Sequence, residues 1–247
     1  MCTARLARHN GMRRMMLFVA PYAFLWLTPS AFGQQENVTR FDAFAGYGFL
    51  DSPAIGLFEN GFAAQVGFRP KTWYSAGFDY SISSGDLTLT PNLLPSSLQQ
   101  ELAAKLGQLA AAGLLPPGYQ LAVPLHSRTQ TFAVGPQLAY RHFGHETFFL
   151  RPLFAGAIYE QATAKPRDAI AAAVVVAQLA PGGKKTDTTW FLGVGGGFDV
   201  LFTKHLALRT QLDVVRDHLF DDLLANGRWT VRFSTGPAFN FGRNIKH

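Results

Sequence analysis

Seven charged residues fall at alternate positions of otherwise apolar or glycine-rich segments, and they are the first candidates for chemistry in this chain. They are Asp42, Asp79, Arg151, Asp199, Arg209, Asp213 and Arg232. Carboxylates and guanidinium groups that leave water must pair, because an unpaired buried charge costs several kcal/mol. The sequence therefore predicts an internal charge network, which either closes an interior space or lines a path for ions. We expect the closing role.

The histidines offer a second kind of chemistry. His126 and His218 fall beside long connections, but neither has a serine and a carboxylate at a spacing that defines a hydrolytic triad. His142, His145 and Glu146 share one short turn, where three such side chains could ligate a metal, although a solvated turn is the expected state. The sequence therefore predicts no catalytic residue, no metal site and no cofactor.

The seven charged residues lie on segments in which apolar side chains alternate with small or polar ones. Eight segments show this pattern: FDAFAGYGFL, GFAAQVGFR, WYSAGFDYSI, TQTFAVGPQLAYR, TFFLRPLFAGAIY, TWFLGVGGGFDV, LALRTQLDVV and WTVRFSTGPAFNFG. Successive side chains of a strand point to opposite faces, so each segment has one apolar face. The pattern predicts an all-β fold: an eight-stranded antiparallel up-and-down transmembrane β-barrel, with lipid outside and polar groups inside.

The two predicted faces differ in composition. With the aromatic positions pointing outward, the outward face of the predicted strands carries no charge, as expected where an arginine or lysine costs about 2–4 kcal/mol at mid-bilayer. The inward face collects glycines, which make room for larger side chains in a narrow barrel. Aromatic rings favour membrane interfaces, so we expect an aromatic girdle at both rims. Its predicted members are Tyr74, Tyr140, Phe148 and Phe241 at the periplasmic rim, and Tyr80, Trp190 and Trp229 at the outer rim.

Three prolines interrupt the predicted strands. Pro136, Pro152 and Pro237 cannot donate to a ladder, and a closed barrel has no free edge to accept them. We therefore expect bulges or irregular pairing nearby.

The first 33 residues have the pattern of a secretory signal, so we expect a signal peptide at 1–33 and one barrel domain at 34–247. Four arginines precede the apolar stretch Met15–Leu27, which is too short to span a bilayer, and small residues follow it. Translation could start at Met1 or at Met12. Cys2, the one cysteine of the sequence, lies in this leader, so no disulfide is expected in the barrel.

The charge of the remaining chain is nearly balanced. Without the four leader arginines, the 22 Lys and Arg fall to 18 against 16 Asp and Glu, a net charge of +2. The sequence therefore gives no support for a nucleic-acid surface.

Longer and shorter connections alternate along the chain, as they do in barrels with short periplasmic turns and longer outer loops. The longer ones are DSPAIGLFEN, Gly85–Ser127, Gln161–Thr188 and Asp217–Gly227. Two of these outer loops are predicted to hold short helices.

The first predicted helix starts at Ser97, which could cap it with Gln100, and Glu101 with Lys105 supports it. The second lies within PRDAIAAAVVVAQLAPGG, with Pro166 in its first turn and Pro181 as its stop, although the valine run could instead form a strand. We expect the helices to pack as a lid over the barrel mouth. The alternative is a surface for a partner or for lipid.

With these features the chain resembles the small eight-stranded outer-membrane barrels, the family of the transmembrane domain of outer membrane protein A. The resemblance covers Val38–Phe241 and rests on the strand pattern, the loop alternation, the opening FDAFAGYGFL and the aromatic closing strand. It implies the outer membrane of a diderm (Gram-negative-type) bacterium, contact with outer-membrane lipid, and recognition by the barrel assembly machinery. That machinery usually reads a terminal Phe or Trp, whereas here Phe241 is followed by GRNIKH.

The expected function is structural or surface contact through the outer loops, with a plugged polar lumen, an extracellular partner at the loops, no enzymatic activity and no nucleic acid. A narrow channel for small solutes or hydrophobic molecules is the alternative. A lipid-modifying outer-membrane enzyme that uses His126 or His218 is the third hypothesis.

Overall fold

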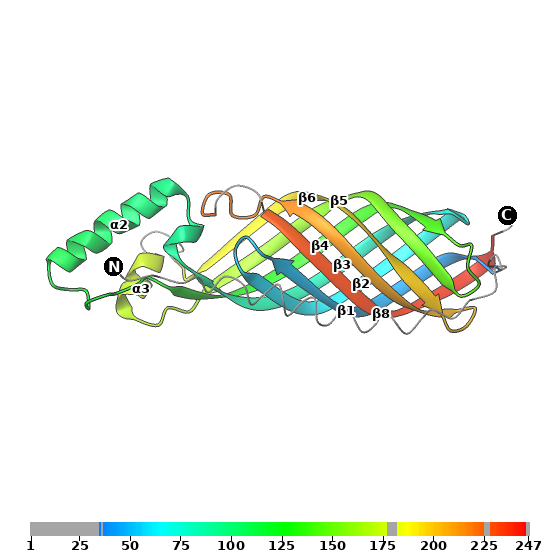
Figure 1. The fold of residues 1–247 in the computed structure, drawn as a ribbon, viewed down its shortest axis with the longest axis horizontal. Helices are drawn as coiled ribbons and strands as arrows, with labels where there is room; N and C mark the ends of the chain where they lie inside the picture. Colours follow the sequence, from blue (N-terminus) through cyan, green and yellow to red (C-terminus); the bar gives the residue numbers. More distant parts are fainter. Residues whose placement is uncertain (1–34, 36, 177–181, 225–227, 246–247) are drawn as a thin grey trace, which may run out of the picture.

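The described residues form a closed barrel of eight antiparallel strands (Figure 1). The computed structural model describes residues 35, 37–176, 182–224 and 228–245, so the predicted signal peptide lies outside them. Each strand pairs with its neighbours in the sequence, and β8 returns to β1, which confirms the predicted all-β meander. The strands are β1 (Thr39–Ser52), β2 (Leu57–Lys71), β3 (Tyr74–Leu89), β4 (Val123–Tyr140), β5 (Glu146–Ala164), β6 (Lys184–Leu201), β7 (Leu206–Asp217) and β8 (Arg228–Asn244).

Side chains that alternate along the sequence point alternately to the inside and to the outside of the barrel. In β1, Asp42 and Phe44 are buried, whereas Phe41 and Tyr47 are exposed on the outside. Other strands continue this outer apolar surface, with exposed residues that include Phe62, Val66, Phe78, Phe132, Val134, Leu150, Trp190, Val194, Leu212, Trp229 and Phe239. Large apolar side chains thus cover the outside of the ring, the reverse of a water-soluble surface.

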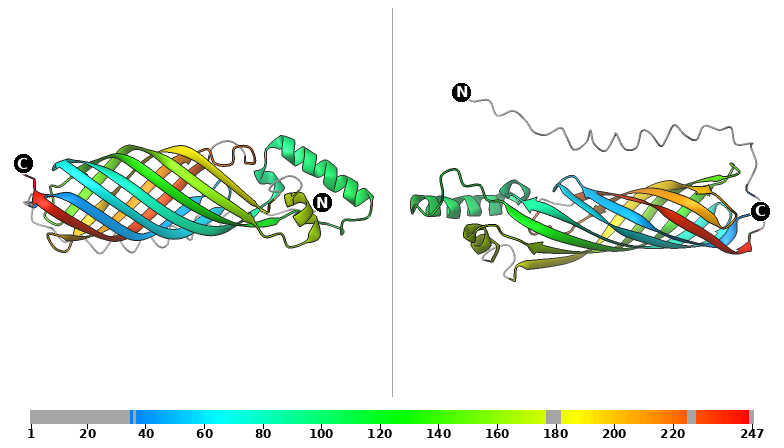
Figure 2. Two further views of the ribbon diagram at one scale, coloured as in Figure 1. Left: turned by 180° about the vertical axis from the view of Figure 1, so that it is seen from behind. Right: turned by 90° about the horizontal axis from the view of Figure 1, so that it is seen from below.

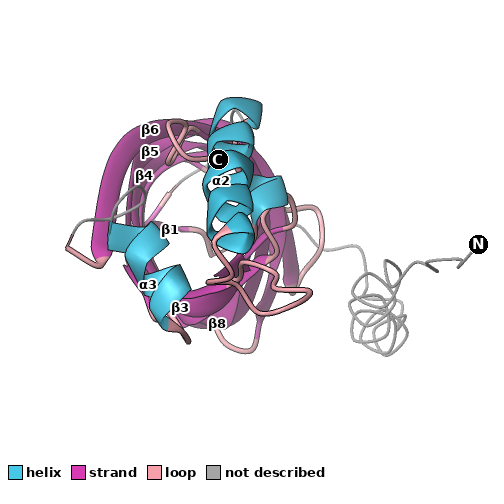
Figure 3. Cartoon of the chain, turned by 90° about the vertical axis from the view of Figure 1, so that its left-hand side faces the viewer, coloured by secondary structure: helices cyan, strands magenta, loops and turns pink. Residues whose placement is uncertain are grey.

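Two ends of the barrel are easily told apart. Short links at 72–73, 141–145 and 202–205 lie at one end, called the turn end here (Figure 2). The other end, called the loop end, has three longer links, at 90–122, 165–183 and 218–227, and a turn at 53–56. The loop end carries a 3₁₀ helix, η1 (Pro91–Leu93), and the helices α2 (Ser96–Ala111) and α3 (Ala169–Val174). Figure 3 looks onto this end, with α2 and α3 in front of the ring of strands. Among the described residues, no helix is long and apolar enough to cross a membrane.

The helix starts differ from those expected. Helix α2 begins at Ser96 after Pro95 and has no side-chain cap, so the predicted Ser97 cap is wrong. Leu94 and Pro95 both have extended backbone between η1 and α2, as expected for a proline and the residue before it. Asp168 caps α3 by accepting from Ala171 N at 2.7 Å, which leaves Pro166 outside the helix. The predicted stop, Pro181, lies outside the described residues.

Several strands run further toward the loop end than the sequence pattern indicated. The first connection is a turn at 53–56 rather than ten residues, because β1 and β2 keep pairing as far as Ser52 and Leu57. Strands β3 to β6 likewise extend into segments that were expected to be loop.

The strand prolines are accommodated in two ways. Register shifts between Val134 and Leu138 and between Arg151 and Phe154 flank Pro136 and Pro152, as predicted. Pro237 is different, since it pairs with Leu208 in an unshifted ladder between β7 and β8. Beside it, β1 and β8 approach so closely that a Cβ on Gly236 would lie 2.5 Å from Gly46 Cα. Glycine is required at this crossing.

Candidate functional site

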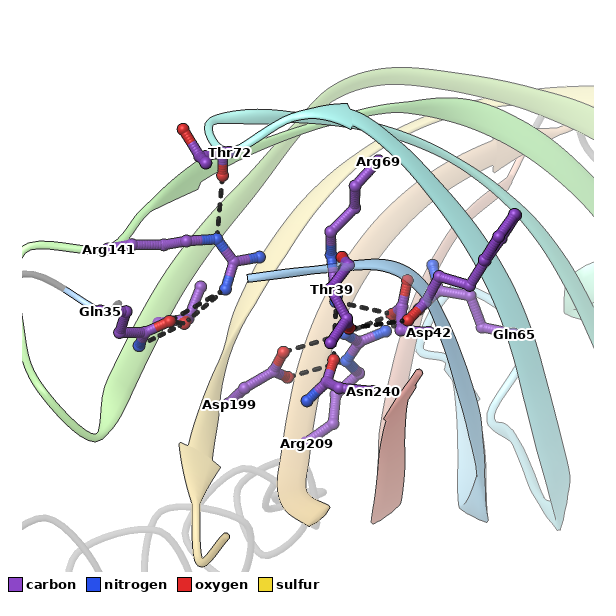
Figure 4. Close-up of polar contacts among 12 residues, drawn as sticks. Gln35, Thr39, Asp42, Gln65, Arg69, Thr72, Arg141, Asp199, Arg209 and Asn240 are labelled. Carbon is purple, nitrogen blue, oxygen red and sulfur yellow. Dashed lines mark hydrogen bonds and ion pairs between the residues drawn. The ribbon is translucent and has the colours of Figure 1, made fainter. Parts of the chain in front are cut away.

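The barrel interior holds ion pairs in three layers, and the first lies near the turn end (Figure 4). Arg209, with an exposed fraction of 0%, donates to both carboxylate oxygens of Asp199, at 2.7 and 2.9 Å. Its Nη2 also lies 2.7 Å from Asp42 Oδ2, and Arg69 Nη2 lies 3.3 Å from the same oxygen. Gln65 accepts a further hydrogen bond from Arg209 at 2.6 Å. One guanidinium therefore joins acids from two strands, β1 and β6.

The second layer is centred on Arg151. This buried guanidinium pairs with Asp79 and, at 3.0 Å, with Asp213. Gln211 donates to Asp213 at 2.7 Å. Arg232 lies opposite Asp213 in the ladder between β7 and β8, but it donates to Ser81 Oγ at 3.4 Å instead of forming an ion pair.

A third layer near the loop end consists of residues that the sequence analysis missed. Arg228 pairs with Glu160 and, at 2.9 Å, with Asp217. Ser127 also donates to Glu160, at 2.8 Å. These residues, like Arg69 in the first layer, occupy positions of their strands whose side chains point inward. That alternation was the signal in the sequence that could have identified them. The predicted strands were too short to include Glu160, Asp217 and Arg228.

Glycines beside the charged groups leave room for them. A Cβ on Gly195 would lie 1.9 Å from Asp213 Oδ1, and one on Gly67 would lie 2.1 Å from Asp42 Oδ1. Any other residue at either position would displace a carboxylate from its layer.

The turn end is crossed by a further arginine, Arg141, from the link at 141–145. It donates to Thr72 O and to Thr147 Oγ1, both at 2.9 Å, and Gln35 Nε2 donates to the same Thr147 oxygen at 2.9 Å. Burial, with Arg69 nearby, lowers the pKa of Arg141 to about 9. The guanidinium therefore stays charged at neutral pH.

The predicted girdle residues lie on the outside of the barrel. Tyr74 and Tyr80 are half-buried there, and the other five are exposed. Tyr80 packs on Phe132 with ring centroids 5.0 Å apart. The exposed guanidinium of Arg216 lies over the ring of Trp229 near the loop end, with its Cζ 5.8 Å from the ring centroid, so the two form a cation–π contact.

Each histidine considered for catalysis has a carboxylate partner but no serine among its hydrogen-bond partners in the described chain. His126 Nδ1 lies 2.8 Å from Asp86 Oδ1, and His218 Nδ1 lies 3.0 Å from Asp221 Oδ2. Asp86 faces His126 across the ladder between β3 and β4, a pairing that spacing along one strand could not reveal. In the part of the chain that the structure describes, no group of three His, Cys, Asp or Glu side chains could hold a metal.

An apolar cluster joins the two helical loops at the loop end. Leu94 and Leu102, from the segment that carries η1 and α2, pack with Ala171 and Val175 of the α3 segment. Tyr119 also links the two loops, because its hydroxyl donates to Asp168 at 3.0 Å. Burial and the Asp168 carboxylate raise the pKa of Tyr119. The two loops thus form one packed unit over the strand ends.

Comparison with known proteins gives likeness of shape only. No protein-family model matches the sequence, and no curated protein matches it. Among solved structures, Neisserial surface protein A has 13% identity and a TM-score of 0.42, covering 81% of this chain and 96% of that one. Ail, the attachment invasion locus protein of Yersinia pestis, has 8% identity, a TM-score of 0.42, and coverage of 84% and 100%. The outer membrane protein OprG from Pseudomonas aeruginosa has 10% identity, a TM-score of 0.46, and coverage of 85% and 99%. The fold of this chain is identified by its own closed ladder of eight antiparallel strands.

Proposed function

We propose that this chain is a non-enzymatic barrel of the outer membrane of a diderm bacterium, with a lumen closed by ion pairs and outer loops that make surface contacts. In this arrangement the turn end faces the periplasm and the loop end faces outward, as in barrels with short periplasmic turns. Outer-membrane lipid contacts the apolar outside, and the barrel assembly machinery inserts the chain.

The outer surface has the height that a bilayer requires. Trp229 and Phe241, both exposed, lie near opposite ends of β8. The two positions are twelve residue steps apart, which corresponds to about 40 Å of strand. At the usual strand tilt this is a height of about 30 Å, close to the hydrocarbon thickness. The exposed aromatic and aliphatic side chains between Trp229 and Phe241 therefore cover a height close to that of the hydrocarbon core of a bilayer.

The closed lumen rests on one observation: the three layers of buried acids and arginines. Each layer joins strands that are not neighbours, for example β3, β5 and β7 around Arg151. Such pairs cross the interior instead of lining one wall. An ion that passed through would have to break them, at a cost of several kcal/mol for each unpaired charge.

Single-channel recording in planar bilayers tests the closed lumen. The wild-type barrel should show no steady conductance, whereas Arg151→Met and Arg209→Met should each raise the conductance by removing a cross-lumen pair. Lys105→Met, in an exposed pair on α2, is the matched control and should leave it unchanged. A wild-type barrel that conducts as well as the variants would contradict the proposal.

A narrow channel for small solutes or hydrophobic molecules is the second candidate, and one cavity favours it. A space of about 350 Å³, part of it open to solvent, lies beside Asp213 and Arg232, with Ser81 and Ser83 also in its wall. Steady conductance of the wild-type barrel, or solute flux into vesicles, would support the channel.

The outer loops are the proposed site of contact with an extracellular partner. Their shared apolar cluster holds α2 and α3 together, so the loops present a fixed surface. Deletion of residues 96–111 should abolish attachment to the partner while the barrel still folds. If the deletion leaves attachment unchanged, the contact role of this loop is refuted.

A further inference from the structure

An apolar cavity lies between the strand ends and the outer loops, above the third charge layer. It contains about 610 Å³ of space, part of it open to solvent. Small-molecule sites are mostly apolar, as this wall is. The ends of β3, β4 and β5, the α3 segment and the segment 218–224 all contribute to its wall. Its main apolar side chains are Leu87, Leu125, Val175, Phe220, Leu223 and Leu224.

The wall of the cavity offers no free charge. Of the described residues that line it, Glu160 and Lys185 are ionisable. Glu160 accepts from Ser127 and pairs with Arg228, and Lys185 pairs with Asp222. A charged guest would therefore lose its hydration without gaining a counter-charge, whereas a neutral apolar guest would lose nothing comparable.

The roof of the cavity is held in place by its own hydrogen bonds. Phe220 has a φ of 56°, in the left-handed region that a bulky residue rarely adopts. Its N–H donates to Asp187 at 2.5 Å, and its carbonyl accepts from Leu223 N at 2.8 Å and Leu224 N at 2.7 Å. A conformation of this kind persists where surrounding contacts determine it. These contacts fix Leu223 and Leu224 against the cavity.

In the membrane placement proposed above, the cavity lies outside the bilayer, on the side of the outer loops. Ala162 and Lys185 of its wall face each other in the ladder between β5 and β6. Lys185 is five residues before Trp190, which corresponds to about 13 Å along the barrel axis at the usual rise and tilt. A guest would therefore enter from the outside, away from the bilayer tails.

We propose that this cavity binds a small neutral apolar molecule, either a compact hydrocarbon or a single alkyl chain. An apolar guest would displace water from the apolar wall, where that water finds few hydrogen-bond partners. The proposal concerns a binding site at the loop end and holds whether or not the lumen conducts.

The test uses the full chain refolded in lipid nanodiscs, with hexafluorobenzene followed by ¹⁹F NMR and nanodiscs without protein as the background. Decan-1-ol and sodium decanoate then serve as competitors. Saturable binding of hexafluorobenzene is expected for a compact guest, and saturable binding of decan-1-ol for an alkyl chain. Either result supports the site. Decanoate should bind at least tenfold more weakly than decan-1-ol, because the carboxylate finds no free cation.

Variants locate the binding in the cavity. Leu224→Asp puts a charge in the wall, and Ala162→Phe fills the space, so each should weaken binding at least tenfold. Leu114→Asp is the matched control, because Leu114 is 64% exposed and lies outside the cavity, and its affinity should equal that of wild type. Migration on unboiled gels confirms that each barrel is folded. The proposal is overturned if neither probe binds saturably, if decanoate binds as tightly as decan-1-ol, or if both cavity variants keep wild-type affinity.

Discussion

Replacement of Arg209 by methionine tests the energetic importance of the charge layers. Methionine retains an unbranched apolar stem but removes the guanidinium that pairs with Asp42 and Asp199. Both acids are buried, so the substitution leaves two carboxylates in the interior without the guanidinium of Arg209. Removal of one partner from a buried pair costs about 3–5 kcal/mol. Because Arg69 remains 3.3 Å from Asp42, we expect the lower end of this range, about 3 kcal/mol.

Urea unfolding in lipid vesicles, followed by migration on unboiled gels, measures this change. Lys105→Met is the control, since its pair with Glu101 is more than half exposed and should contribute about 0–1 kcal/mol. The double variant Arg209→Met/Asp199→Asn should recover at least half of the loss, because it also removes the acid that is left alone. A free energy of unfolding for Arg209→Met within about 1 kcal/mol of wild type would refute the reasoning.

Three further predictions concern a glycine, the outer surface and a helix cap. Gly195→Val places a Cβ 1.9 Å from Asp213 Oδ1 and should lower the free energy of unfolding by about 1–3 kcal/mol in urea; an unchanged midpoint contradicts this. Val194→Arg exposes a cation to lipid and should cost about 2–4 kcal/mol in the same assay; wild-type stability would place this residue outside the bilayer. The Ala171 N–H lowers the pKa of Asp168, so the cap should protect that amide from hydrogen exchange at neutral pH and lose protection as pH falls through the lowered pKa. In Asp168→Asn this acid-dependent loss should disappear, and its persistence would show that another group titrates.

The strand pattern predicted the faces of the barrel because side-chain direction depends only on position along one strand. Asp42, Asp79 and Asp199 are all buried on the inward face. The pattern could not predict which acid meets which base. Arg151 on β5 reaches acids on β3 and β7, and that geometry depends on the diameter and strand stagger of the closed ring.

The same reasoning explains why the third charge layer was missed. Near the loop end the outward positions become polar, as at Thr186 and Thr188 in β6. Beyond the bilayer an outward side chain need not be apolar, so the contrast between the faces fades although the ladder continues. The strands that carry Glu160 and Arg228 therefore looked shorter than they are.

The helix caps show a different limit. Glu101 and Lys105 form the expected pair at 3.0 Å, because residues four apart share a helix face. The first helical residue depends on the conformation of the chain before it, and here Pro95 rather than a serine occupies the cap.

Spin-label accessibility at neighbouring positions of β7 tests the central claim most directly. Leu212 is 52% exposed and Gln211 is 6% exposed, so adjacent side chains should face opposite environments. The sequence has one cysteine, Cys2, so Leu212→Cys and Gln211→Cys can each be labelled with a nitroxide in a Cys2→Ser background in lipid vesicles. We predict that oxygen from the bilayer reaches the label at position 212, that a water-soluble nickel complex does not, and that the label at 211 is shielded from the bilayer. Oxygen contact at 211 together with nickel contact at 212 would contradict the account.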